Sequence, residues 1–246
     1  MKSFGLTDKG KVRKDNQDCF IIEKCPSKSC MIVVLCDGMG GAKAGGIASQ
    51  LSNKAFVSYI YTKLTSRTAR TADYRRILTS ACTEANGVSY EYSHFDDAFN
   101  GMGTTIVGGV IKYNGNGYII NVGDSRAYLI GKRRIAQITR DHSLVEDMVS
   151  RGKITRAQAQ NHPQKNIITR AVGVEASVSS DLFDVKLSSG NRILLCSDGL
   201  SNIVSSEEML LISGNNQNLE KACEAFLDLA MKRGAPDNVT VFLAER

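Results

Sequence analysis

Two short apolar segments, far apart in the chain, each run into an aspartate followed by a glycine. The first is Met31-Ile-Val-Val-Leu-Cys36 before Asp37-Gly38, and the second is Asn191-Arg-Ile-Leu-Leu-Cys196 before Ser197-Asp198-Gly199. Short apolar runs that stop at turn residues are typical of buried strands. The chain is therefore expected to fold around a sheet in which two buried strands each end in a carboxylate.

The rest of the pattern predicts one α+β domain over residues 1–246. Apolar residues at helical spacing predict helices over 44–64, 72–92, 143–160, 206–212 and 219–233. Further strands are expected at 104–111, 117–122, 126–130, 135–139, 182–187 and 239–243. The four strands between 104 and 139 are separated by short turns and predict an antiparallel meander. Helix pairs before and after the strands predict packed sheets with helices on both outer faces.

Composition excludes several classes of protein. The chain of 246 residues has a net charge of +6, too small an excess to indicate nucleic-acid binding. Its three histidines, His94, His142 and His162, lack the spacing of a zinc site. Seven cysteines without a CxxC pair favour a reducing, cytoplasmic setting, and no segment has the apolar length of a signal peptide or a membrane span.

Two more aspartates follow the same pattern as Asp37 and Asp198. Asp124 lies between two expected strands, and Asp237 precedes the last one. Taken singly, an Asp-Gly pair usually marks a turn. If the strand ends meet, however, the carboxylates repel one another unless cations bind among them. Hard divalent ions such as Mg²⁺ or Mn²⁺ take oxygen ligands, and a glycine at position 38 allows a backbone carbonyl to approach them.

Two other chemistries are less favoured. The glycine-rich stretch 38–46 could cradle a phosphate at the start of a helix, but it lacks the Gly-Lys-Ser/Thr ending of a nucleotide-binding loop. Cys36 and Cys196 could act as thiol nucleophiles, but each ends an apolar strand without a Cys-x5-Arg loop. Packing in the core is the favoured role of both thiols.

Seven motifs, in order along nearly the whole chain, resemble those of the metal-dependent serine/threonine protein phosphatases of the protein phosphatase 2C type, in their compact bacterial form. They are residues 12–18, 37–41, 101–105, 123–126, 141–143, 197–200 and 237–240. The resemblance implies a central antiparallel β-sandwich flanked by helix pairs, in four layers, with a flap over about 143–173.

The resemblance also implies two core metal ions, Mn²⁺ or Mg²⁺. Asp37 would bridge them, and the Gly38 carbonyl would be a further ligand. Asp198 and Asp237 would complete the shell of one ion, and Asp18 would act mainly through bound water.

Asp124, together with Asp198, resembles the ligands of a third and weaker ion. Arg13 matches the arginine that binds the substrate phosphate, for which a planar guanidinium is suited because it pairs with two oxygens at once. The implied activity is hydrolysis of phosphoserine and phosphothreonine in proteins by a metal-bridging hydroxide, so that Asp37, Asp198, Asp237 and Arg13 are the expected catalytic residues. The expected partners are phosphorylated proteins and an opposing serine/threonine kinase, and the expected state is a monomer.

The chain departs from many relatives at two positions. Gln17 replaces a glutamate, and Met39 stands where animal relatives carry a histidine suspected of being the general acid. His142 and His162 are candidates for that proton donor, although a surface or capping role is favoured for both. The sequence identifies no general acid.

The expected flap has two interpretations. It could be a solvated surface insertion, or a mobile cover whose cations receive an acidic substrate loop. The cations in question are Arg151, Lys153, Arg156 and Lys165.

Two alternative functions remain open. One is a metal-dependent phosphatase that acts on small phosphate esters or on a phosphorylated regulator of transcription. The other is a pseudophosphatase that only binds, against which the central carboxylates are intact.

Overall fold

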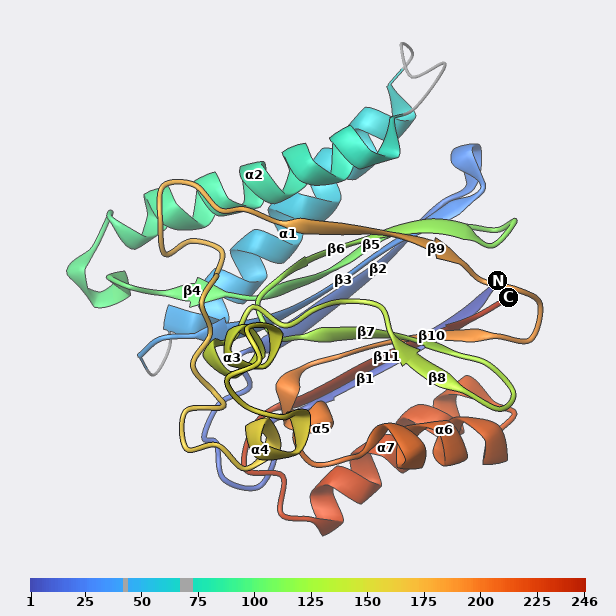
Figure 1. The fold of residues 1–246 in the computed structure, drawn as a ribbon. Coiled ribbons are helices and arrows are strands. Elements are labelled where there is room, and N and C mark those ends of the chain that lie inside the picture. Colours follow the sequence, from blue (N-terminus) through green and yellow to red (C-terminus); the bar gives the residue numbers. More distant parts are fainter. Residues whose placement is uncertain (42–43, 67–72) are drawn as a thin grey trace.

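Two antiparallel sheets stacked face to face form the centre of the computed structural model, which describes residues 1–41, 44–66 and 73–246 (Figure 1). One sheet has the strand order β1-β11-β10-β7-β8, and the other has the order β2-β3-β5-β6-β9, with the short β4 paired to β3. The strands are β1 (Lys2–Asp8), β2 (Asp18–Cys25), β3 (Cys30–Met39), β4 (Gly103–Thr104), β5 (Ile106–Lys112), β6 (Asn116–Val122), β7 (Arg126–Ile130), β8 (Ile135–Gln137), β9 (Asp181–Lys186), β10 (Arg192–Cys196) and β11 (Val239–Glu245).

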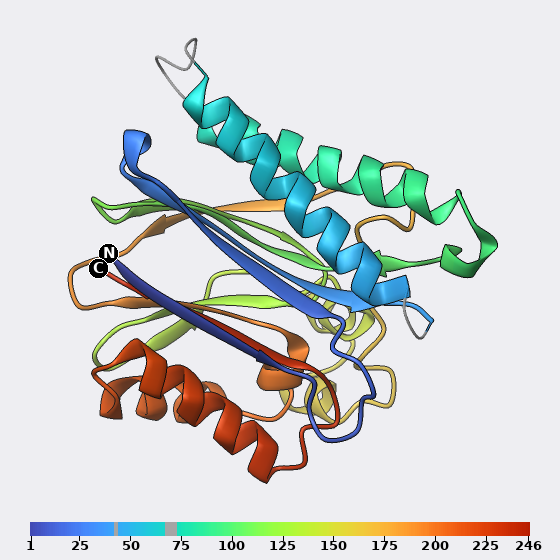
Figure 2. The same ribbon diagram turned by 180° about the vertical axis from the view of Figure 1, so that it is seen from behind.

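A helix pair covers the outer face of each sheet, which completes four layers (Figures 1 and 2). The pairs are α1 (Ala44–Thr65) with α2 (Tyr74–Ser93), and α6 (Ser206–Asn215) with α7 (Leu219–Lys232). Shorter helices are α3 (Leu144–Ser150), α4 (Arg156–Gln160), α5 (Asp198–Ser201) and the 3₁₀ turns η1 (Pro26–Lys28) and η2 (Asp97–Phe99). The predicted α+β sandwich is confirmed. Of the predicted second helix, Ala72 lies outside the described residues, as do residues 42 and 43 of the glycine-rich stretch.

Strand β3 shows why the central strands are apolar throughout. Ile32, Val34 and Cys36 pack under α1 and α2. Val33 and Leu35 pack against the other sheet, in the same cluster as Phe242. A strand covered on both faces reads as a continuous apolar run rather than an alternating one. Among the described helices, none combines the length and apolar character needed to cross a bilayer.

The predicted meander is wrong at the connection between β6 and β7. Strand β6 pairs with β5 and β9, whereas β7 pairs with β8 and β10 in the other sheet. The chain changes sheets at Gly123, whose φ of 102° lies in the left-handed region that glycine adopts without strain. The sequence of such a tight turn is the same whether the next strand joins the sheet of the preceding strand or the other sheet.

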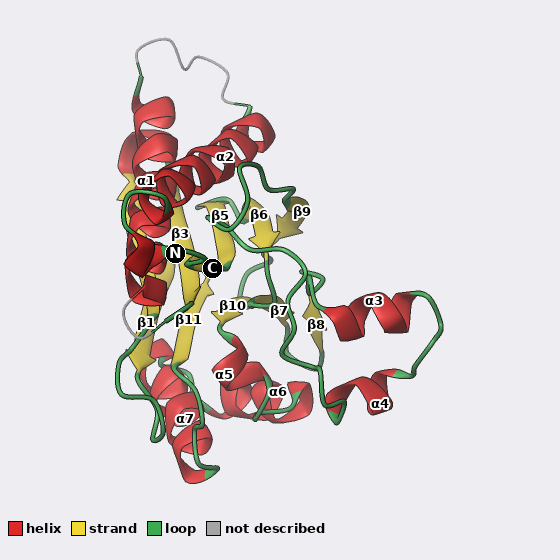
Figure 3. Cartoon of the chain, turned by 90° about the vertical axis from the view of Figure 1, so that its left-hand side faces the viewer, coloured by secondary structure: helices red, strands yellow, loops and turns green. Residues whose placement is uncertain are grey.

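Three more elements differ from the prediction. Strands β1 and β2 are not predicted because both are only partly buried and mix polar with apolar residues. The helix expected over 143–160 is instead the two helices α3 and α4, which project from the side of the sandwich in Figure 3. Helix α3 ends at Ser150, and Gly152, two residues later, has a φ of 68°. Thr155 then caps the start of α4 through a capping box with Gln158.

Candidate active site

The hairpin of β2 and β3 places two aspartates directly opposite each other. In its register Asp18 pairs with Asp37, which brings their Cα atoms to about 4.5–5.5 Å in a sheet of this kind. Asp37 and Gly38 both lie within strand β3, and Asp198 and Gly199 begin helix α5. The interpretation of these Asp-Gly pairs as simple turns is therefore wrong.

Asp18 is almost completely buried, and only one of its carboxylate oxygens has a partner. Oδ2 accepts a hydrogen bond of 2.7 Å from the Thr240 hydroxyl, and Oδ1 is buried with none. Burial raises the pKa of Asp18 to about 6; hydrogen bonds from Thr240 and Ser197 oppose the rise, and the charge of Asp198 adds to it. An orphaned buried carboxylate oxygen of this kind calls for a cation or a water.

The backbone of Asp37 is fixed by two threonines. Its amide donates to the Thr105 hydroxyl at 3.0 Å, and its carbonyl accepts from the Thr104 hydroxyl at 2.8 Å and the Thr105 amide at 2.9 Å. Thr105 in turn shares a hydrogen bond of 2.7 Å with Ser125 in the turn between the two sheets. Burial, and then repulsion from Asp18, raise the pKa of Asp37 well above its ordinary value.

Asp124 lies in the turn where the chain passes from β6 to β7, and Asp198 follows β10, which pairs with β7. Burial raises the pKa of Asp124 to about 8, with further repulsion from Asp198. Asp198, the first residue of α5, accepts a hydrogen bond of 3.0 Å from the Asn202 side chain one turn later. Its pKa is also raised, by burial and by the charge of Asp237.

Asp237 holds the arginine that the sequence predicts to bind phosphate. Its Oδ2 accepts from Arg13 Nη2 at 2.8 Å, and its Oδ1 accepts from the Asn238 amide at 2.9 Å. The pKa of Arg13 is raised by this hydrogen bond. The remaining donors of the guanidinium are available to a second anion.

Asn238 belongs to the motif 237–240, which gives it no role, and in the structure it positions the loop that carries Arg13. Its buried side chain donates 2.9 Å hydrogen bonds to the carbonyls of Lys9 and Asp15 and accepts one of 2.9 Å from the Gln17 amide. Apart from its place after Asp237, nothing in the sequence distinguishes this asparagine from one in an ordinary turn.

Glycine is required at position 38 for packing. A Cβ atom there would lie 2.1 Å from the Gly45 carbonyl oxygen in the first turn of α1 and 2.7 Å from that of Gln17. The backbone of α1 therefore rests directly on the end of β3.

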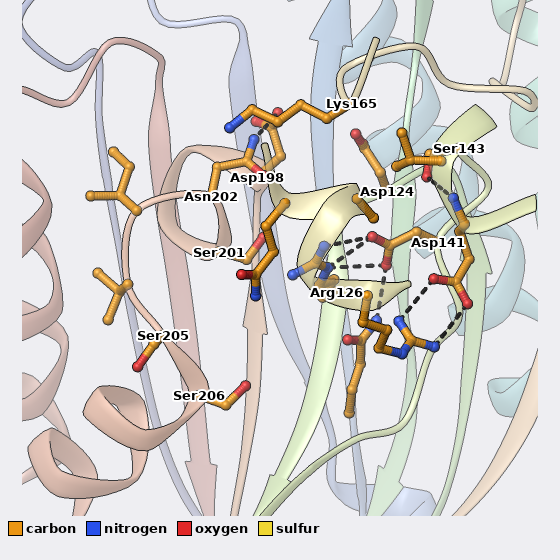
Figure 4. Close-up of a pocket in the computed structure, with 18 of the residues that line it drawn as sticks. Asp124, Arg126, Asp141, Ser143, Lys165, Asp198, Ser201, Asn202, Ser205 and Ser206 are labelled. Atoms are coloured by element: carbon orange, nitrogen blue, oxygen red, sulfur yellow. Dashed lines mark hydrogen bonds and ion pairs between the residues drawn. The ribbon is translucent and has the colours of Figure 1, made fainter. Parts of the chain in front are cut away.

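The predicted site residues line one cavity of about 270 Å³. Its walls include Arg13, Asp37, Gly38, Asp124, Asp198 and Asp237, together with Asn166 and Ile168. Asp18 lies behind Asp37 rather than on the wall. A neighbouring cavity of about 480 Å³ shares Asp124 and Asp198 with it (Figure 4).

The donor set fits hard divalent cations. Every candidate side chain offers carboxylate oxygen, Asp18 has an unused buried oxygen, and burial together with repulsion from the other carboxylates raises the pKa of Asp37. Within the described ranges, no three His, Cys, Asp or Glu side chains are close enough together to hold an ion as they stand.

The histidine candidates take structural roles. His142 is buried rather than on the surface; its Nδ1 accepts from the Gly123 amide at 3.2 Å, and its own amide donates to the Gly123 carbonyl at 2.9 Å. Burial lowers its pKa. His162 caps a turn by accepting from the Gln164 amide at 3.2 Å. Neither histidine lines the cavity of about 270 Å³.

The cysteine candidates lie in the core. Cys36 and Cys196 are fully buried. Burial raises the pKa of the Cys196 thiol to about 12 and that of Cys36 well above its ordinary value, which disfavours a thiolate at either position.

The flap contributes to both cavities. Asn166 and Ile168 reach the smaller one, and Arg156 and Lys165 line the larger one. Arg156 is paired with Glu146 by two hydrogen bonds of 2.9 and 3.0 Å. Arg151 and Lys153 line neither cavity.

Comparison with known proteins gives consistent results along the chain. Residues 9–244 match the family described as Protein phosphatase 2C. The serine/threonine phosphatase stp of Listeria monocytogenes serotype 4b is 37% identical over 241 residues, covering 98% of this chain and 94% of that protein.

Solved structures agree. The serine/threonine phosphatase Stp1 from Staphylococcus aureus superposes with a TM-score of 0.91 at 35% identity, covering 100% of this chain and 94% of that one. The catalytic domain of the serine threonine protein phosphatase PstP, in complex with two manganese ions, gives a TM-score of 0.81 at 30% identity, covering 99% and 97%.

Proposed function

Because the chain belongs to the protein phosphatase 2C family and is a metal-dependent serine/threonine phosphatase, we propose that it hydrolyses phosphoserine and phosphothreonine in proteins and so opposes one or more kinases. The observation that carries the proposal is the convergence of five aspartates and Arg13 at the same ends of the strands, with four of the aspartates on one cavity wall.

Asp37, Asp198, Asp237 and the Gly38 carbonyl are proposed to hold two Mn²⁺ or Mg²⁺ ions, with Asp18 behind them. When bound, such a pair of ions supplies a water of lowered pKa as the nucleophile. Asp124 and Asp198 are proposed to share a third, weaker ion.

The chain's own groups bind and orient the substrate. Arg13 has donors left over from its bond to Asp237, and its planar fork pairs with two phosphoryl oxygens. Thr104 and Thr105 fix the backbone of Asp37, and Thr240 orients the carboxylate of Asp18.

We place this activity in a single catalytic domain over residues 1–246, with residues 143–173 as its flap. We also propose that the protein is a monomer and that it is cytoplasmic; the seven free cysteines, six of them buried, support the reducing compartment.

Phosphate release from a phosphothreonine peptide tests the proposal, with Mn²⁺ or Mg²⁺ and then with chelator. Asp37→Asn should lose more than about a hundredfold in kcat/KM, since even the outer partners of a metal site cost 10- to 100-fold. Because asparagine removes a repelled charge, the metal-free variant should be at least as stable as the wild type. Asp184→Asn, an exposed aspartate of β9, is the matched control and should retain full activity.

Undiminished turnover by Asp37→Asn would exclude the proposed chemistry. Faster turnover of small phosphate esters than of phosphopeptides would favour the metabolite alternative.

A further inference from the structure

Two further cavities adjoin the cavity of about 270 Å³ at the candidate active site, which is here called the catalytic cavity. The catalytic cavity shares Asp124 and Asp198 with the cavity of Figure 4, and it shares Met39 and Ile168 with another cavity of about 480 Å³. The two outer cavities have no lining residue in common, so they extend from the catalytic cavity in different directions.

One outer cavity is here called the apolar arm after the five apolar residues in its lining, Met39, Ile168, Ala171, Val174 and Val178. Its other five lining residues are polar or charged, namely Thr169, Arg170, Glu175, Ser177 and Ser179. Val174 is 39% exposed, and Ile167, which precedes Ile168 in the chain, is 45% exposed, which places both among the few large apolar side chains left open on the described surface. Exposed apolar groups gathered beside a functional cleft indicate a binding surface. An aliphatic side chain of a bound partner fits against the apolar residues of this arm.

The other outer cavity, here called the polar arm, is lined mostly by polar and charged residues, and four of its charged side chains pair within it. Arg126 bonds Asp141 through Nε and Nη2 at 2.7 to 3.0 Å, and Arg156 pairs with Glu146. These four charges are therefore matched inside the arm.

Lys165 differs from the other cations of the polar arm. It lies at the end of the arm that holds Asp198 and Asn202 (Figure 4). None of the ion pairs found in the described part of the chain involves it. A carboxylate brought by a partner is its natural counter-charge.

We propose that the two arms select phosphoproteins by the residues flanking the phosphorylated serine or threonine, with an aliphatic side chain in the apolar arm and an acidic side chain at Lys165. The inference rests on the proposed function. An extended segment advances about 3.3 Å per residue, so residues within three positions of the phosphorylated one reach into the arms while the phosphoryl group lies in the catalytic cavity.

Two variants outside the catalytic cavity test the arms, Val174→Ser and Lys165→Ala. Their substrates are a phosphothreonine peptide with leucine on one side and glutamate on the other, the same peptide in reversed order, one with alanine at both flanks, and p-nitrophenyl phosphate. Each variant should lose about five- to tenfold in kcat/KM on the better flanked peptide, with little change on the alanine peptide and none on p-nitrophenyl phosphate.

Matched controls come from the same chain. Leu211→Ser removes a 62% exposed apolar side chain on α6, and Lys153→Ala removes a flap cation outside the three cavities. Both should leave all four activities unchanged. Lys165→Glu should reverse the charge preference and favour a peptide in which arginine replaces glutamate.

Equal turnover of the flanked peptides by wild type and by both arm variants would overturn the proposal, as would an equal loss on p-nitrophenyl phosphate. Binding of a phosphonate analogue of the peptide, followed by fluorescence anisotropy, separates the two proposals. If the variants bind the analogue more weakly than the wild type does, and neither the wild type nor the variants hydrolyse any of the substrates, the proposed function is wrong and the proposed role of the arms in binding is supported.

Discussion

Gly38 lies where a side chain has no room. Gly38→Ala should destabilise the protein by about 3 kcal/mol or more, because its Cβ atom would meet the backbone of Gly45 rather than a side chain that can turn away. The measurement is urea unfolding, and Gly41→Ala is the control, since nothing lies within 4 Å of a Cβ atom there. Equal stability of the two variants would show that α1 does not rest on β3 as described.

Individual residues of the site differ in how well the sequence predicts them. Asp37 and Asp198 stand out because a charge directly after an apolar strand is rare. Thr105, Thr240 and Asn238, which orient the aspartates and the Arg13 loop, are hydroxyl and amide residues common to any loop. Their partners lie up to 229 residues away in the chain, and no periodicity marks such contacts.

The segment between β1 and β2 is held in place by the side chain of Asn238, the residue just before β11. Asn238→Ala should remove three hydrogen bonds and cost about 3 kcal/mol or more, since buried backbone groups lose their partners. Because that segment carries Arg13, the KM for p-nitrophenyl phosphate should also rise. Asn114→Ala, in the exposed turn before β6, is the control and should alter neither quantity. An unchanged KM in Asn238→Ala would mean that Arg13 is held in place by Asp237 alone.

At the scale of elements, the sequence predicts the strands that are covered on both faces. Strand β10 is predicted to within one residue; the apolar run 31–36 predicts the centre of β3, which continues through Asp37 and Gly38 to Met39. Strand β1 at a sheet edge has no such signal, and its pairing with β11 joins the two ends of the chain. The sheet change at Gly123 is not predictable locally, because the choice of sheet is decided by partners that lie elsewhere in the sequence.

The whole molecule is held together by the layer between its sheets, to which both sheets contribute side chains. Phe242→Ala in this layer should cost about 3–5 kcal/mol. Unfolding should nevertheless remain one transition, with circular dichroism and tyrosine fluorescence coincident, because side chains of both sheets share this central cluster and its loss exposes the inner face of each sheet. Phe95→Ala, at a side chain 86% exposed, should shift stability by less than about 0.5 kcal/mol. Two separate transitions in the wild type would instead divide the chain into two units.

The stability of the metal-free molecule should fall as pH rises. The pKa of Asp18 is raised from 3.8 to about 6 and that of Asp124 to about 8, so the folded protein holds protons that the unfolded chain has lost across this window. The contribution of these two groups to stability is therefore fully present below about pH 4 and is lost as the pH rises toward 8. Urea unfolding in chelator should show this trend, with a flatter upper half in Asp124→Asn. At pH 8, Mn²⁺ at a hundred times its Kd should restore about 2.7 kcal/mol. Rising stability from pH 5 to 8 in chelator would contradict the burial of these carboxylates.

The arrangement of the strands also places the candidate active site at one end of the sandwich and leaves the opposite end open to engineering. The turns at 26–29, 113–115, 131–134 and 187–191, and both chain ends, lie at the strand ends opposite the aspartates. Strand β11 has seven residues, and the six steps from Val239 to Glu245 span about 20 Å of extended chain. A reporter domain inserted in one of those turns, or a chain circularly permuted there, keeps every carboxylate in its register. The same insertion between Val122 and Arg126 would separate Asp124 from its neighbours.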